Sequence, residues 1–174
     1  MTSTTATIER LPLDESFAAP ATSEALHRSA HALRSHGFEV EIVADGTAAR
    51  ELVLSRIAGG SEVHSGSSLT LDTIGLSEAL EQSGDYLPLR PRIWSMDRKT
   101  QRDSIRKLGA APDVFVNSVQ AVTEDGSLVV ASSSGSQLGP IASGAGHVYF
   151  VVGAQKVVPD LATALRRIET YAYP

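Results

Sequence analysis

Three segments in the second half of the chain constrain its fold most, because each is apolar on both faces of a strand. They are DVFVNS at 113–118, SLVVAS at 127–132 and HVYFVVG at 147–153. A strand of this kind has to be covered on both sides, which is typical of the parallel sheets of α/β proteins. The three segments therefore predict a largely parallel sheet with helices on both of its faces.

Helical and strand patterns alternate along the rest of the chain, as such a sheet requires. The expected elements are a helix from Thr22 to Gly37, a strand over 38–44, a helix from Asp45 to Gly59, a strand over 62–64, a helix beginning near Leu69, a polar helix from Asp97 to Gly109 and a last helix over 160–171. Residues 84–95 hold two prolines and Trp94, and we interpret them as an irregular connection that docks on the body. We expect a three-layer α/β domain whose ligand site lies beyond the carboxyl ends of its strands.

The chain is expected to consist of an arm and one domain. Residues 1–19 are rich in threonine, serine and alanine without a clear period, which predicts a flexible N-terminal arm. The α/β domain is expected over residues 20–174. The exposed end of its sheet and the connection at Trp94 would suit a homodimer.

Composition limits the function classes open to this chain. A formal charge of -5 does not suit nucleic-acid binding by phosphate neutralisation. The absence of cysteine excludes disulfides, thiolate metal ligands, a cysteine nucleophile and an iron–sulfur cluster held by this chain. No segment has the pattern of a signal peptide or a membrane span, so we expect no membrane partner and a cytoplasmic location.

The loop HSGSSLT at 64–70 is a candidate binding element, because it follows a predicted strand and opens a helix. Gly66 lets the backbone approach a ligand, and Ser67 and Ser68 offer hydroxyl groups. The N–H groups at the start of the helix suit a phosphate or a carboxylate. A plain serine cap of the helix explains the same residues equally well.

The loop NSVQAVTEDG at 117–126 is a second candidate. Asn117 and Ser118 stand where a parallel strand delivers side chains to a site. Glu124 and Asp125 are adjacent carboxylates, and such groups do acid or base work when one is desolvated. Asp-Gly is also a common turn dipeptide, so a plain turn is the stronger interpretation and catalysis by Glu124 the weaker one.

The tract SSSGSQLGP at 132–140 is the third candidate. A linker would need a second domain after it, whereas the remaining strand and helix are needed to complete the first domain. We therefore interpret the tract as an internal loop that forms a binding wall for a polar ligand, with Gln137 as both donor and acceptor. Its candidate ligand-binding residues are Ser134, Gly135, Ser136 and Gln137. The alternative is a solvent-exposed loop without a ligand.

The histidines predict no metal site. His27 and His31 have the i, i+4 spacing that can hold a metal when a third ligand converges on it. No HExxH pattern accompanies them, and Arg28 and Arg34 share the helix, so a solvated face is the better interpretation. His64 directly precedes the Gly-Ser-Ser loop, where it either contacts a ligand or packs at the end of its strand.

Four stretches of the sequence, taken in order, carry a family resemblance. They are EVHSGSSLTLDTIGL, MDRKTQRDSIRKLGAAPD, SVQAVTEDGSLVVASSSGSQLGP and VVGAQKVVPDLATALRRIETY. Together they resemble the LUD-domain family of lactate-utilisation proteins over roughly residues 20–174. The resemblance implies the NagB/RpiA/CoA-transferase-like fold and a part in oxidising lactate to pyruvate, beside separate iron–sulfur subunits.

The chain departs from the family pattern in two places. Where many members have an Asn-Arg pair after the glycine of the third loop, this chain has Ser136, Gln137 and Leu138 after Gly135. Many relatives also continue past the proline that is Pro174 here.

Three functional hypotheses follow. In the first, the chain is a LUD-type component of lactate utilisation that binds a small anionic or nucleotide-like ligand at the three loops. In the second, it is a CoA-transferase-like enzyme in which Glu124 attacks an acyl-CoA to form a covalent intermediate. In the third, it is a purely structural subunit, whose fold no ligand stabilises. None of the three identifies a cofactor.

Overall fold

In the computed structural model, which describes residues 12–173, the chain forms two units that each have a sheet of their own. The first unit comprises the chain up to Glu39, the segment Gln120–Val129 and the chain from Ala154 onward. The second unit comprises Val40–Val119 and Val130–Gly153.

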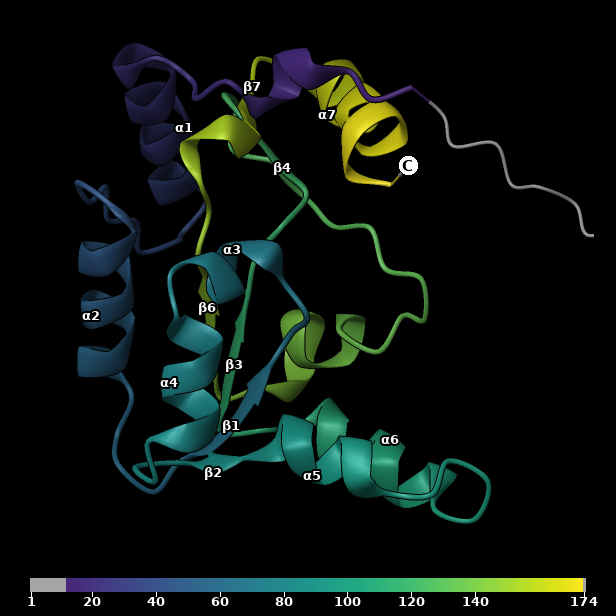
Figure 1. The fold of residues 1–174 in the computed structure, drawn as a ribbon. Helices are drawn as coiled ribbons and strands as arrows, with labels where there is room; N and C mark the ends of the chain where they lie inside the picture. Colours follow the sequence, from purple (N-terminus) through teal and green to yellow (C-terminus); the bar gives the residue numbers. More distant parts are fainter. Residues whose placement is uncertain (1–11, 174) are drawn as a thin grey trace, which may run out of the picture. The chain divides into compact units, whose positions relative to one another are not determined.

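The second unit is built on a four-stranded parallel sheet with the order β2-β1-β3-β6 (Figure 1). Its strands are β1 (Glu62–Ser65), β2 (Leu87–Pro88), β3 (Val114–Asn117) and β6 (His147–Phe150). All four residues of β3 are buried, as expected for a central strand that is covered on both faces. The predicted α/β class with a largely parallel sheet is confirmed.

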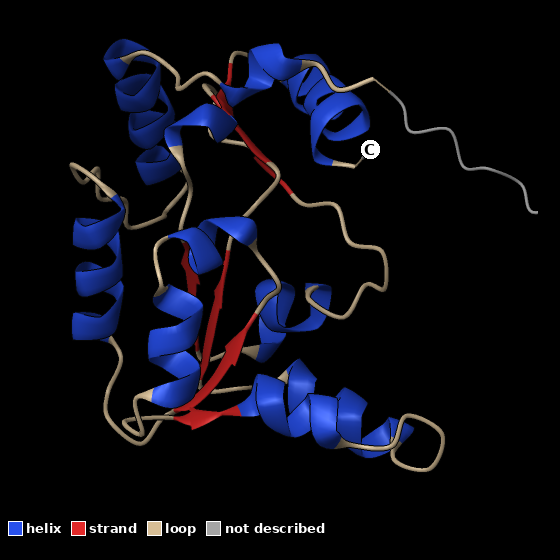
Figure 2. Ribbon diagram, viewed as in Figure 1, coloured by secondary structure: helices blue, strands red, loops and turns tan. Residues whose placement is uncertain are grey.

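Helices pack against both faces of this sheet (Figure 2). On one face, Val63 and Val114 pack with residues of α2 (Gly46–Arg56), α3 (Leu69–Thr73) and α4 (Leu76–Gln82). Side chains alternate along a strand, so His64 and Phe115 lie on the opposite face. The elements beside that face are α5 (Leu89–Ser95), α6 (Arg102–Ala110) and η2 (Pro140–Gly144).

The first unit contains a smaller sheet with the order β5-β4-β7. Its elements are η1 (Glu15–Ala18), α1 (Ser23–Ser35), β4 (Ala121–Thr123), β5 (Leu128–Val129), η3 (Ala154–Lys156), β7 (Val157–Val158), α7 (Leu161–Arg167) and η4 (Ile168–Ala172). Phe17, Ala121, Val158 and Ala164 form its buried core. Residues 1–11 of the arm predicted at 1–19 lie outside the described residues, and Phe17 of η1 belongs to this core.

Three predicted helix starts are confirmed by the caps that form there. The side chains of Thr22, Asp45 and Asp160 accept hydrogen bonds from the backbone N–H groups three residues later, at 3.3, 2.9 and 2.7 Å. A side-chain oxygen at this position pairs one of the N–H groups that a helix leaves open at its start. These residues therefore set where α1, α2 and α7 begin.

Three local predictions were wrong. Residues 38–44 form no strand, because Phe38, Ile42 and Val43 are exposed and no strand pairs with them. The segment at 127–132 forms only the two-residue β5, which pairs antiparallel with β4 instead of joining the parallel sheet. The irregular connection at 84–95 instead contains β2 and α5.

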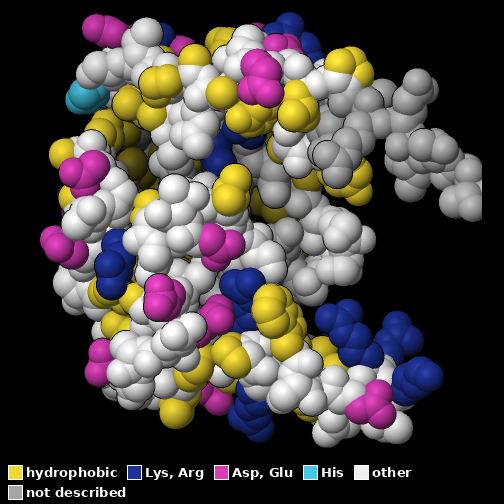
Figure 3. Space-filling model, in the orientation of Figure 1, with side chains coloured by type: hydrophobic (Ala, Val, Ile, Leu, Met, Phe, Trp, Pro, Cys, Tyr) yellow, Lys and Arg dark blue, Asp and Glu magenta, His cyan; other side chains and the backbone are white. Residues whose placement is uncertain are grey.

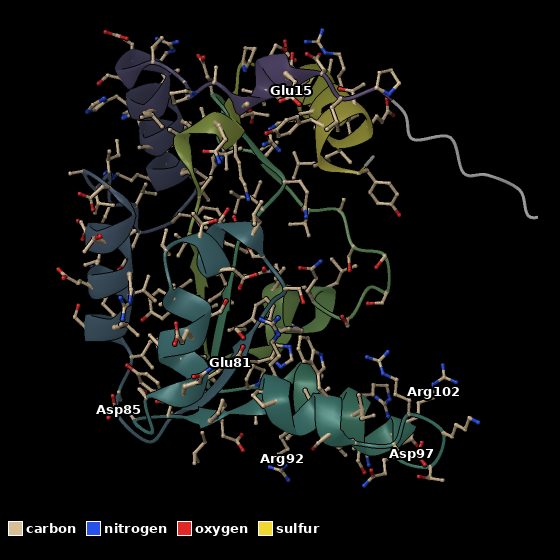
Figure 4. The ribbon with its side chains drawn as sticks, in the orientation of Figure 1. Glu15, Glu81, Asp85, Arg92, Asp97 and Arg102 are labelled. Carbon is tan, nitrogen blue, oxygen red and sulfur yellow. The ribbon has the colours of Figure 1, made fainter. Side chains whose placement is uncertain are left out.

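Basic side chains gather at the α5–α6 end of the second unit. Residues 90–107 contain seven of the fifteen lysines and arginines and only two acidic residues, so this stretch is basic within an acidic chain. Figure 3 shows the dark blue side chains together there, and Figure 4 labels Arg92 and Arg102 among them. None of the helices within residues 12–173 is long and apolar enough to cross a membrane.

Candidate functional site

Three of the predicted binding residues come together at the carboxyl end of the parallel sheet. Asn117 donates a hydrogen bond from Nδ2 to Oε1 of Gln137 at 2.5 Å. Gly66 lies so close to Asn117 that a Cβ atom at Gly66 would overlap the whole side-chain amide. One residue from each of the three candidate loops therefore lies at this end of the sheet, in contact with Asn117 or, for Asn117 itself, with the other two.

The pairing of β1 with β3 produces this meeting. Ser65 is opposite Val116, and the backbone N–H of Gly66 donates to the carbonyl of Val116 at 2.9 Å. The next residues, Gly66 and Asn117, thus lie side by side just where the two strands end. Parallel strands end at the same edge of a sheet, which is where α/β proteins place their ligands.

The remaining predicted residues of the first and third loops are less closely placed. Ser67 is exposed, and Ser68 precedes α3 without a side-chain cap hydrogen bond. The third loop is held by its own hydrogen bonds: Ser134 Oγ donates to Ser136 Oγ at 3.0 Å, and the N–H of Gly135 donates to Ser132 Oγ at 3.0 Å. Their part in ligand binding stays a prediction.

Asn117 and Ser118 differ in what they contact. Asn117 is 2% exposed, and the N–H of Val151 donates to its backbone carbonyl at 2.9 Å. Its side chain is therefore fixed by Gln137 and its main chain by the segment that follows β6. Ser118 is buried too, with its hydroxyl 3.5 Å from the carbonyl of Val119.

A charged cluster that the sequence did not reveal lies beside β1. Ser65 Oγ donates to Oε1 of Glu81 at 2.8 Å, and Arg90 donates from a terminal guanidinium nitrogen to the same oxygen at 3.2 Å. Glu81 comes from α4 (Figure 4), and Arg90 comes from α5, in the connection predicted to be irregular. The only feature of the sequence that pointed to this cluster was the position of Arg90 between two prolines.

His64 lies next to Ser65 of this cluster, with its side chain on the other face of β1. Its ring stacks on Phe115 with 5.4 Å between the ring centroids. Burial and, to a smaller extent, the positive charge of Arg90 lower the pKa of His64 below its usual value. His64 is therefore neutral at pH 7, with its ring held in one orientation.

Glu124 belongs to the first unit and takes part in an ion pair there. Its Oε2 accepts a hydrogen bond from Nε of Arg28 at 2.6 Å, and this bond lowers the pKa of the carboxyl group. The turn after it is closed by a hydrogen bond of 3.0 Å from the N–H of Gly126 to the carbonyl of Thr123. Gly126 has φ +85°, a backbone conformation that favours glycine. These contacts suit the interpretation as a turn, and the catalytic role of Glu124 stays a prediction.

Other site types have less support in the residues that the structure describes. Within 12–173, no group of three or more histidines, aspartates or glutamates could hold a metal ion. A shallow hollow of about 200 Å³ is lined by Glu62, Leu87, Pro88, Leu89 and Arg92. It begins at the first residue of β1, so it is at the amino end of the strand and not at the site described above.

Comparison with known proteins gives one result. A family model described as the LUD domain matches residues 26–174, which is most of the chain. Neither the curated proteins nor the solved structures searched contain a match.

Proposed function

We propose, since the chain belongs to the LUD-domain family, that it serves in lactate utilisation by binding a small anionic ligand at the carboxyl end of its parallel sheet. Family membership suggests the lactate-utilisation role. The ligand and its place are our proposal. The observation that carries it is the convergence of Gly66, Asn117 and Gln137 from three separate loops.

The chemical groups of these three residues suit a polar ligand. Gly66 has no side chain, so the Asn117 amide packs directly against its backbone, and two primary amides offer both N–H donors and carbonyl acceptors. The Asn117–Gln137 hydrogen bond and the bond from Gln137 Nε2 to the carbonyl of Ala131, at 3.4 Å, hold these amides in place before a ligand arrives. Groups that are already ordered lose less entropy on binding.

The proposal includes partner proteins for the redox step. The chain has no cysteine, so cysteine-held iron–sulfur clusters would have to be in separate subunits, as the family resemblance implies. Exposed basic residues over α5, α6 and their connection support a docking surface for such a subunit. They are Arg92, Arg98, Lys99, Arg102, Arg106 and Lys107.

Thermal unfolding in the presence of single compounds tests the ligand. The panel contains lactate, pyruvate, CoA esters, sugar phosphates and nucleotides, each at equal ionic strength. A compound present at 100 times its dissociation constant adds about 2.7 kcal/mol to the stability of the folded state. We expect one class of small anion to raise the midpoint for the natural chain and to do so much less for Gln137→Ala.

The matched control is Ser133→Ala, an exposed position in the same loop that is not among the candidate ligand-binding residues. It should keep the full ligand-induced shift. If no compound raises the midpoint of the natural chain, or if Gln137→Ala keeps the full shift, the proposed site is wrong.

A further inference from the structure

Two buried nitrogen atoms beside β1 have no hydrogen-bond partner among the described residues. They are Nδ1 of His64 and Nε of Arg90. The Nε atom of arginine always carries a hydrogen, so it is a donor without an acceptor. Leaving a buried polar group unpaired costs stability, and such a group in a native protein calls for an explanation, for example a bound molecule.

Both side chains are held in place by other contacts. The His64 ring stacks on Phe115 and passes within 3.8 Å of the position where a Cβ on Gly109 would lie. The Arg90 guanidinium donates to Glu81 at 3.2 Å and lies over the ring of Trp94, with 4.4 Å from Cζ to the ring centroid. The two unpaired atoms therefore belong to side chains that other contacts already hold.

The two groups are also close to each other. Arg90 binds the same Glu81 oxygen, at 3.2 Å, that Ser65, the residue after His64, binds at 2.8 Å, and α5 packs against β1. His64 shares its face of β1 with Gly66, two residues further on, because side chains alternate along a strand. The pair thus stands next to the polar meeting point of Gly66, Asn117 and Gln137.

We infer that His64 and Arg90 bind the carboxylate of a small monoanionic ligand, which accepts hydrogen bonds from Arg90 Nε and from His64 Nδ1. This inference rests on the proposed function and names the class of ligand that the site takes. The ion pair of Glu81 with Arg90 carries no net charge. Protonation of His64 on binding adds one positive charge, which one carboxylate balances, whereas a phosphate dianion would leave one negative charge unbalanced.

Proton binding should accompany ligand binding at this pair. The charged groups that act on His64 are Arg90 from α5 and, through its ion pair with Arg90, Glu81 from α4. Its other neighbours, Phe115 from β3 and Gly109 from α6, carry no charge. A bound carboxylate favours the protonated form of His64, so binding should be tighter at pH 6 than at pH 8.

The single tryptophan of the chain provides the measurement. Trp94 is 59% exposed and contacts the Arg90 guanidinium, so its fluorescence reports on events at that group. The natural full-length chain is titrated with sodium lactate, pyruvate and acetate, and with sodium phosphate and sodium chloride at matched ionic strength. We expect a saturable change with the carboxylates, at least tenfold weaker binding of phosphate, and none with chloride.

Three variants locate the binding. Arg90→Lys keeps a positive charge near Glu81 but lacks Nε, and His64→Gln removes the ring without touching Arg90. Each should weaken carboxylate binding at least tenfold, and His64→Gln should also lose the difference between pH 6 and pH 8. Arg50→Lys, at an exposed arginine of α2, should bind like the natural chain.

The outcomes separate this inference from the proposed function. If Gln137→Ala loses binding while Arg90→Lys and His64→Gln keep the affinity of the natural chain, the proposed site stands and the inference is overturned. If no carboxylate binds the natural chain but another anion of the panel binds and Gln137→Ala weakens that binding, only the inference is overturned; if no anion binds, both are overturned. If Arg90→Lys does not fold, NMR of the natural chain provides the test. The pKa of His64 should rise when lactate is added, and an unchanged pKa contradicts the inference.

Discussion

Asn117, the last residue of β3, donates a hydrogen bond from its side-chain amide to Gln137 in the 132–139 loop at 2.5 Å. The same amide fills the space where Gly66 would carry a side chain. These two contacts tie the polar loop to the ends of the two central strands, and they make Asn117 the centre of the proposed site. The predictions below test this arrangement and the contacts that stabilise each unit.

Gly66→Ala should destabilise the protein and reduce ligand binding. The added Cβ would overlap the Asn117 amide, which is itself buried and bonded to Gln137. Overpacking of this kind typically costs about 1–3 kcal/mol, measurable by urea unfolding. Gly59→Ala is the control, because a Cβ there would meet only the carbonyl of Asp85, at 3.9 Å. Equal stability of the two variants would contradict the close packing at Gly66.

Arg167→Met should be far more harmful than Arg166→Met. Arg167 is 3% exposed and donates to the backbone carbonyls of Gln120 and, at 3.3 Å, Gln155. Its removal leaves both acceptors without this donor, at a cost of about 2–4 kcal/mol in urea unfolding. The neighbouring Arg166 makes a long, exposed ion pair of 3.9 Å with Asp14 and lies over the Phe17 ring, 5.1 Å from the centroid, so its loss should stay within about 1 kcal/mol. Similar losses for both variants would show that the carbonyl contacts contribute little.

Stability should rise with pH in the alkaline range because of Lys156. Burial, and to a lesser extent the charge of Arg167, lower the pKa of Lys156 to about 8, whereas in the unfolded chain it is near 10.5. Between these values the unfolded chain holds a proton that the folded chain has lost. Stability therefore increases across this window, by up to about 1.4 kcal/mol per pH unit.

The measurement for Lys156 is urea unfolding at several pH values between 7 and 10.5, on the natural chain and on Lys156→Met. The variant should lack the alkaline increase. Lys99→Met, at an exposed lysine, should keep it. A flat profile in the natural chain would mean that Lys156 is not desolvated in the folded state.

Glu124→Gln should change stability only slightly, and only above the pH at which the folded carboxyl group is protonated. Arg28 lowers the pKa of Glu124, so the ion pair stabilises the folded state above the usual carboxyl range. This contribution disappears as the pH falls through the lowered pKa. Thermal unfolding of the variant and the natural chain should therefore converge at low pH.

The same variant tests the acyl-transfer hypothesis. A glutamyl adduct, trapped after incubation with a panel of acyl-CoAs and detected by mass spectrometry, would support it if Glu124→Gln abolished the adduct. We expect no adduct on either protein, because the Glu124 carboxylate is paired with Arg28 at 2.6 Å. Arg28→Gln serves as the control for loss of the ion pair alone.

The class of the fold and the starts of several helices could be predicted from the residues alone. Apolar runs such as the one at 114–117 can be buried only inside a sheet covered on both faces, and capping side chains act within three residues of themselves. Both effects are local, so they can be read along the chain. The same locality explains the error at 38–44, where a strand-like pattern finds no neighbouring strand to pair with.

Which residues meet at the site depends on how the strands pair and the loops pack. Loop composition pointed to Gly66, Asn117 and Gln137 separately, and strand pairing put the first beside the second. No sequence pattern pairs His64 with Arg90, because their unpaired atoms depend on what surrounds them in three dimensions. Whether a polar atom has a hydrogen-bond partner, and which charges lie near it, depends on how the chain packs. Periodicity and composition therefore do not predict either property.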